Sequence, residues 1–243
     1  MNGQAFPAGT AFAAGSDAPE KSEVRVGFVA LTDCAPVVMA AAKGFDAKYG
    51  IRIVPTRASS WASIRDQLMA GDLDAAQILY GLVYGLELGV GGPQQEMAIL
   101  MTLNQNGQGI SLASQLRDQG VTDGEALAAL VAKHPAGSFA FAQTFPTGTH
   151  ALWLNYWLAA IGIDPLRDVR TISVPPPQMV LTCRLGRMHG FCVGEPWNQR
   201  GIADGVSFSV ASSQDVWPDH PEKVLGTTAA WVAQYPNTAR ALT

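Results

Sequence analysis

The chain has 243 residues, of which 48% are hydrophobic and 15% are charged, and its formal net charge at pH 7 is -4. These values fit a globular protein with a sizeable core in one or two domains. No run of lysine or arginine occurs, so we expect no direct binding of nucleic acid. No stretch of about 18 apolar residues occurs either, so we expect no transmembrane segment.

The first 23 residues are rich in Ala, Gly, Pro and Ser and carry no positive charge before Lys21. They contain no apolar stretch long enough for the core of a signal peptide. We therefore predict a disordered leader over residues 1–23 and favour a cytoplasmic location. A periplasmic location is the alternative if a leader was removed.

From Val24 onward, strand-like segments alternate with helical ones. Strands are predicted at 24–31, 51–58 and 74–79, with helical segments at 34–50 and 61–71. This βαβαβ order predicts a parallel sheet with helices on its faces. Asp33 and Ser60 stand at positions typical of helix N-caps, and Gly44, Gly50 and Gly71 are expected at helix ends.

A second series of the same kind follows two extended segments at 97–104 and 109–114. It has strands at 138–143, 169–175 and 189–194, helices at 149–161 and 178–188, and a short helix after Pro196. Two βαβ-type units indicate an α/β protein of two lobes. A ligand site is expected in the cleft between them.

Three cysteines, Cys34, Cys183 and Cys192, form no CxxC pair and lie in apolar surroundings. We predict buried free thiols and neither a disulfide framework nor a zinc site.

Seven segments resemble, in the same order, the nitrate-binding branch of the ABC-transporter solute-binding proteins: "GFVALTDCAPVVMAAAKGF", "SSWASIRDQL", "LNQNGQGISLAS", "FPTGTHALWLNYWLAAIGIDP", "VPPPQMV", "GFCVGEPWNQR" and "WPDHPEKVLG". That branch includes exported nitrate and bicarbonate receptors and a cytoplasmic nitrate/nitrite sensor that partners an RNA-binding antiterminator. The resemblance implies a type II periplasmic-binding-protein fold, with two lobes that are joined by two crossing strands and close on a small oxyanion. Lobe 1 would comprise residues 24–110 and 222–243, and lobe 2 residues 111–221.

Members of this branch continue well beyond the segment that matches residues 229–243. The resemblance therefore implies a chain that lacks the C-terminal part of the family, with apolar surface of lobe 1 left uncovered.

The same resemblance assigns ligand contacts to His150, Lys223, Trp61 and Gln108. Lys223 would supply the positive charge, and the other three would supply N–H donors. Nitrate is planar, singly charged and only accepts hydrogen bonds, so a selective site needs convergent donors, one fixed cation and no carboxylate facing the ligand.

The segment "TFPTGTHALWLNYW" places His150 at the start of a predicted helix, where free backbone N–H groups and the helix dipole favour an anion. Gly148 would allow close approach of the chain, and Thr149 would add a side-chain donor. Without the resemblance, His150 would be taken for a cap or surface group, Trp61 for core, Gln108 for a turn residue and Lys223 for a solvated lysine.

Glu195 is a different case, because a carboxylate beside nitrate would repel it. We expect it to support His150, Arg200 or Lys223 from outside the ligand contacts, whereas in a bicarbonate receptor a carboxylate could accept the ligand's hydroxyl proton. Pro175–Pro177 forbid a central-strand ladder, so "VPPPQMV" is also consistent with a structural turn.

Gln77 stands where exported receptors often carry histidine, which, together with the lack of a signal peptide, favours the sensor over the transport receptor. The expected partners are nitrate or nitrite and either the antiterminator or an ABC permease. Receptors for bicarbonate or an alkanesulfonate share the fold and remain alternatives.

An enzyme is the remote alternative, since the fold also hosts a few enzymes of cofactor biosynthesis. Cys192 with His150 or His189 could be imagined as a thiol–imidazole pair, but Cys192 lies in an apolar strand-like run. A metal site from His150, Glu195 and His189 has no supporting spacing. We therefore expect no catalysis, no metal and no cofactor.

Overall fold

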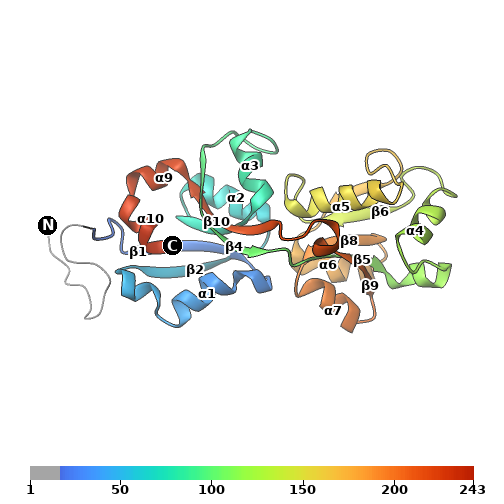
Figure 1. Cartoon of the computed structure of the whole chain (residues 1–243), viewed down its shortest axis with the longest axis horizontal. Helices are drawn as coiled ribbons and strands as arrows, with labels where there is room; N and C mark the ends of the chain where they lie inside the picture. Colours follow the sequence, from blue (N-terminus) through green and yellow to red (C-terminus); the bar gives the residue numbers. More distant parts are fainter. Residues whose placement is uncertain (1–16) are drawn as a thin grey trace.

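The computed structural model describes residues 17–243, and its strands form two separate five-stranded sheets, one in each lobe (Figure 1). The first sheet has the order β2-β1-β3-β10-β4 and the second the order β7-β6-β8-β5-β9. The strands of the first sheet are β1 (Glu23–Val29), β2 (Arg52–Ala58), β3 (Ala75–Leu79), β4 (Met97–Gln105) and β10 (Pro221–Thr228). Those of the second are β5 (Gln108–Ala113), β6 (Ala140–Gln143), β7 (Arg170–Ser173), β8 (Gly190–Gly194) and β9 (Ser207–Ser212).

Helices cover both faces of each sheet (Figure 1). Lobe 1 carries α1 (Ala35–Ala42), α2 (Trp61–Ala70), α3 (Tyr80–Glu87), α9 (Ala229–Gln234) and α10 (Pro236–Leu242). Lobe 2 carries α4 (Gly124–Val131), α5 (Thr149–Ala160), α6 (Met179–Arg184), α7 (Trp197–Ala203) and α8 (Ser213–Val216). Single 3-10 turns are η1 (Thr32–Cys34), η2 (Asp46–Tyr49), η3 (Ser114–Gln119) and η4 (Pro176–Gln178).

The end signals of α2 act as its sequence predicts. The Ser60 hydroxyl accepts a hydrogen bond from the Ser63 N–H, and Gly71 ends the helix in the left-handed conformation at φ 74°. Asp33, in contrast, does not cap a helix: it lies within η1, and the residue before α1 is Cys34. The prediction of an Asp33 cap is wrong because its carboxylate is used at the interface between the lobes.

The predicted parallel pairs are confirmed, with β1 parallel to β2 and β3, and β6 parallel to β7 and β8. Each sheet also contains antiparallel strands. β10 pairs with β3 and β4, and β5 pairs with β8 and β9. Both sheets are therefore mixed: β10 joins the first sheet after the chain returns from lobe 2, and β5 is the strand by which the chain enters lobe 2.

The chain passes between the lobes twice, at Asn106–Gly107 and between α8 and β10. Asn106 and Gly107 have φ of 54° and 83°, a left-handed pair that separates β4 from β5. The predicted boundary after residue 110 falls inside β5, so the first crossing comes a few residues earlier. The return to lobe 1 occurs at β10, next to the predicted residue 222.

Residues 17–23 are tied to lobe 1. The Glu20 carboxylate accepts hydrogen bonds from the N–H groups of Asn237 and Thr238 at the start of α10. The prediction of a disordered leader is therefore wrong for residues 17–23, while residues 1–16 lie outside the described part of the chain.

An apolar pocket of about 190 Å³ opens on lobe 1 beside Thr243 and is lined in part by Val37, Ile53 and Leu225. Among the helices within residues 17–243, none combines the length and the apolar character needed to cross a bilayer.

Candidate functional site

The two lobes contact each other on both sides of a buried polar cluster. On one side, the Thr32 N–H donates to the Glu195 carbonyl oxygen at 2.8 Å, and the Trp197 indole donates to the Ala30 carbonyl oxygen at 3.0 Å. On the other side, α3 meets the start of α5. A Cβ on Gly81 would lie only 2.6 Å from the Thr147 carbonyl oxygen. The lobes are thus in a closed arrangement around the cluster.

Lys223 is the cation at the centre of this cluster, and its side chain is fully buried. Its ammonium group lies 2.9 Å from Asp33 Oδ2 and donates a hydrogen bond to Glu222 Oε1. Burial alone would lower the pKa of Lys223, but Glu222 and Asp33 outweigh this effect and raise the pKa above its ordinary value. Lys223 is therefore a permanent positive charge.

His150 comes from the first turn of α5 and is also fully buried. Its Nδ1 lies 2.9 Å from the Thr144 hydroxyl, whereas Nε2 has no hydrogen-bond partner among the described residues. Nε2 lies 3.7 Å from Glu222 Oε1. Burial, and then the nearby Lys223 ammonium, hold the pKa of His150 well below its usual range, so the ring is neutral. When Thr144 donates to Nδ1, the ring proton lies on Nε2 and is available to a ligand.

The low pKa of His150 predicts that acid destabilises the chain. The unfolded ring takes up a proton below about pH 6.5 while the folded ring does not, so the free energy of unfolding falls as pH drops below that value. The contribution of His150 reaches about 1.4 kcal/mol per pH unit. The free energy of unfolding, measured with urea between pH 5 and 8, should show this slope. His150→Gln should reduce the slope by the contribution of about one proton. His134→Gln, at an exposed site, is the control; an unchanged slope in His150→Gln would contradict the assignment.

Trp61 and Gln108 approach the same point from different elements. Trp61 begins α2, packs fully buried in the core of lobe 1, and has its ring centroid 5.5 Å from Lys223 Nζ. Its indole N–H is buried without a partner among the described residues. Gln108 begins β5, and its amide donates to Glu222 Oε2. The structure therefore brings together four side chains that the resemblance singled out, namely Trp61, Gln108, His150 and Lys223.

Thr149 and Gly148 lie beside this cluster. The Thr149 hydroxyl is buried without a hydrogen-bond partner in the part of the chain that the structure describes, and Thr149 lines an apolar pocket of about 560 Å³ together with Tyr80 and Trp153. Gly148 precedes α5 in an extended conformation, and a Cβ on it would lie 2.6 Å from Leu79 Cδ1. Lobe 1 therefore approaches the backbone closely at Gly148, and the predicted close approach of Gly148 to a ligand stays a prediction.

The carboxylates are arranged differently from the sequence prediction. Glu195 does not support His150, Arg200 or Lys223 through its side chain: its carboxylate accepts from the Gln199 N–H, and its backbone carbonyl contacts Thr32. The expectation that no carboxylate faces the donors is also wrong. Glu222 contacts Lys223 and Gln108 directly.

The roles of Asp33, Gln77 and Glu222 in the cluster were not predicted from the sequence. The Gln77 amide donates to Asp33 Oδ1, and its Oε1 accepts from the Val29 N–H, so Gln77 orients the carboxylate that faces Lys223. Asp33 follows β1, at the carboxyl end of a parallel strand, and this position was an available signal. Glu222 gave no such signal.

The cysteines are free. Cys183 and Cys192 are buried as predicted, and Cys34 is half-buried. Burial raises the pKa of Cys183 to about 11. Burial and then Glu222 raise the pKa of Cys192 far above its ordinary value, which disfavours the thiolate that a nucleophile requires. Within residues 17–243 no cluster of three His, Cys, Asp or Glu side chains is arranged to hold a metal ion.

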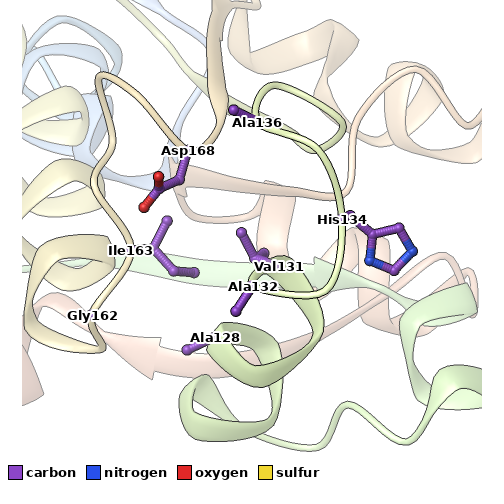
Figure 2. A pocket seen from close by; sticks show the side chains of 8 residues that line it. All are labelled: Ala128, Val131, Ala132, His134, Ala136, Gly162, Ile163 and Asp168. Atoms are coloured by element: carbon purple, nitrogen blue, oxygen red, sulfur yellow. The ribbon is translucent and has the colours of Figure 1, made fainter.

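A pocket of about 230 Å³ lies at the end of lobe 2 remote from lobe 1, lined by α4 and by the loops near His134 and Asp168 (Figures 1 and 2). Its ionisable groups are already engaged. His134 Nδ1 contacts the Leu130 carbonyl oxygen at 2.9 Å, and Asp168 accepts from the Asp164 N–H at 2.8 Å. The buried cluster between the lobes is therefore the stronger candidate site.

Two α/β lobes that are joined by two crossings and closed on a buried cation define the type II periplasmic-binding-protein fold. A comparison of the sequence with known families matches residues 17–243 to the NMT1-like family, and the chain belongs to this family.

Relatives with described functions are similar over nearly the whole chain. The nitrate/nitrite binding protein NrtA of Synechocystis sp. is 43% identical over 236 residues, covering 94% of this chain and 52% of that protein. The crystal structure of the periplasmic nitrate-binding protein NrtA from Synechocystis matches with a TM-score of 0.87 and 42% identity, covering 93% of this chain and 60% of that one. The nitrate import ATP-binding protein NrtC of Synechocystis sp. is 39% identical over 232 residues, covering 95% of this chain and 35% of that protein. The chain thus spans about half the length of the NrtA relative.

Proposed function

We propose that the chain binds nitrate, or the related anion nitrite, between its lobes as the substrate receptor of an ATP-driven nitrate importer. The observation that carries this proposal is the convergence of Lys223, His150, Gln108 and Trp61 on one buried point between the lobes. The nitrate-binding relatives support the same ligand.

The chemistry of the four side chains suits an anion that only accepts hydrogen bonds. Lys223 supplies a charge that burial does not remove, and the Trp61 N–H and His150 Nε2 have no protein partner among the described residues. Such buried donors are costly unless a ligand completes them, so they favour binding of an acceptor. Because Trp61 and Lys223 belong to lobe 1 while His150 and Gln108 belong to lobe 2, the full set forms only when the lobes close.

Closure is the signal that a receptor passes to its partner. An anion that contacts both lobes favours the closed form over the open one by its differential affinity, and a partner that recognises the closed form is then engaged. We propose a permease as this partner, because similar proteins include an ATP-binding subunit for nitrate import. The relatives give no support to the antiterminator partner or the cytoplasmic location favoured by the sequence, and the similar crystal structure is of a periplasmic protein.

Bicarbonate is a second candidate because of one observation. Glu222 places a carboxylate among the donors, and a carboxylate can accept the hydroxyl proton that bicarbonate has and nitrate lacks. Nitrate remains our first choice because Lys223, Trp61 and His150 all offer hydrogens.

Calorimetric titration of the chain with nitrate, nitrite and bicarbonate tests the proposal. We expect nitrate or nitrite to bind at one site per chain and more tightly than bicarbonate at the same pH, and chloride serves as the control for unspecific anion binding. Tighter binding of bicarbonate would reverse the order of the two candidates. The absence of binding by both nitrate and nitrite would contradict the proposal.

A further inference from the structure

Glu222 already occupies the donors that we assign to the anion. Its side chain is fully buried; Oε1 accepts from the Lys223 ammonium, Oε2 accepts from the Gln108 amide, and Oε1 lies 3.7 Å from His150 Nε2. One planar carboxylate thus lies against three of the four side chains that we propose hold the anion. An entering anion must share these donors with it.

The charges around Glu222 make this sharing unfavourable. Lys223 is the one cation in contact among the described residues, while Asp33 on η1 and Glu222 itself are carboxylates, so the cluster carries a net charge of -1. His150 on α5 is neutral, and the Cys192 thiol on β8 is protonated. His220, just before β10, lies near His150, and its Nδ1 lies 3.0 Å from the Pro221 carbonyl oxygen. A second anion would bring the buried charge to -2, and residues 17–243 place no further cation against the cluster to balance it.

Glu222 has little freedom to withdraw. It lies in β10, the neighbouring Lys223 pairs with β3 on one side and with β4 on the other, and the strand residues around it are buried.

We propose that binding of nitrate is coupled to the uptake of one proton from solvent, which the Glu222 carboxylate carries in the loaded site. The protonated carboxyl keeps the net charge at -1 and changes an acceptor-only group into an O–H donor, which suits an acceptor-only ligand. This inference rests on the proposed function.

The experiment measures nitrate affinity by calorimetry at pH 6, 7 and 8, and in phosphate and Tris buffers at one pH. Uptake of one proton predicts a dissociation constant that rises about tenfold per pH unit. It also predicts that the binding heats in the two buffers differ by the difference between the ionisation enthalpies of phosphate and Tris. The buffer comparison uses the unaltered chain and does not depend on any variant folding.

Glu222→Gln identifies the group that takes up the proton, because an amide keeps the shape and already offers hydrogens. We expect this variant to bind nitrate with no pH dependence and at least tenfold more tightly than the unaltered chain at pH 8. Glu125→Gln makes the same change at an exposed position of α4 and should behave like the unaltered chain.

Nitrate binding without pH or buffer dependence in the unaltered chain would overturn the coupling and leave the proposed function intact. A retained tenfold slope in Glu222→Gln would overturn the assignment to Glu222 and move the proton to another group such as His150. No binding of nitrate at any pH would overturn both proposals.

Discussion

Lys223→Met should abolish detectable nitrate binding and also destabilise the chain. Methionine keeps much of the volume but removes the ammonium, which is the only cation that contacts the cluster within the described residues. The loss of one partner of a buried ion pair leaves Asp33 and Glu222 uncompensated, and such losses cost about 3–5 kcal/mol. Urea unfolding measures the stability, and calorimetry at a temperature where the variant is folded measures the binding.

A second substitution separates the two effects. In Lys223→Met/Asp33→Asn, one stranded carboxylate becomes a neutral amide, and the oxygen of that new amide can still accept the hydrogen bond from Gln77. The double variant should regain part of the lost stability but no nitrate binding. If the double variant bound nitrate as tightly as the unaltered chain, Lys223 would not be the charge that holds the anion.

Gly81→Val should weaken nitrate binding by about 10–100-fold, because overpacking costs about 1–3 kcal/mol. The substitution leaves the four proposed ligand contacts themselves unchanged. A Cβ at position 81 would lie 2.6 Å from the Thr147 carbonyl oxygen and 3.2 Å from the Thr149 nitrogen, and both are backbone atoms of lobe 2. The new side chain therefore opposes closure. It should not weaken α3 itself, because valine has a higher helix propensity than glycine. Small-angle X-ray scattering at saturating nitrate should report a larger radius of gyration than for the unaltered chain.

Leu88→Val is the matched control, since it places the same side chain at the exposed end of α3. It should bind nitrate normally. A Gly81→Val chain that closed and bound like the unaltered protein would show that the contact between α3 and α5 does not limit closure.

Trp61, Gln108 and His150 were assigned as ligand contacts through the family resemblance; their local sequence places them at the starts of helices and strands but does not by itself mark them as donors. His150 follows small residues at the start of a long apolar helix, and Trp61 follows the Ser60 cap. Gln108 follows the left-handed Asn106–Gly107 turn. Such features mark the ends of helices and strands, and these ends are where side chains of an α/β protein meet.

Glu222 could not be predicted in the same way. Successive residues of a regular strand point to opposite faces, so the position next to Lys223 should face away from the site. The register of β10 against β4 shifts on both sides of Lys223, and this irregularity places both side chains in one buried cluster. A bulge of this kind depends on the partner strand, more than 100 residues away in the sequence.

The alternating strands and helices were predictable where their periodicity was clear, as in β1 and α2. The helix α3 was not predicted, because "YGLVYGLE" contains two glycines and little polar alternation. These glycines are explained by lobe closure: a Cβ on either would clash with Thr147. The packing between the lobes thus requires two glycines that lower the local helix propensity of α3.

A crystal structure of the chain grown with excess nitrate would show where the anion binds. We expect a planar anion between the lobes, within hydrogen-bond distance of Lys223 Nζ, His150 Nε2, Gln108 Nε2 and Trp61 Nε1. Nitrate bound elsewhere, with Lys223 still held by Glu222 and Asp33 alone, would contradict this expectation.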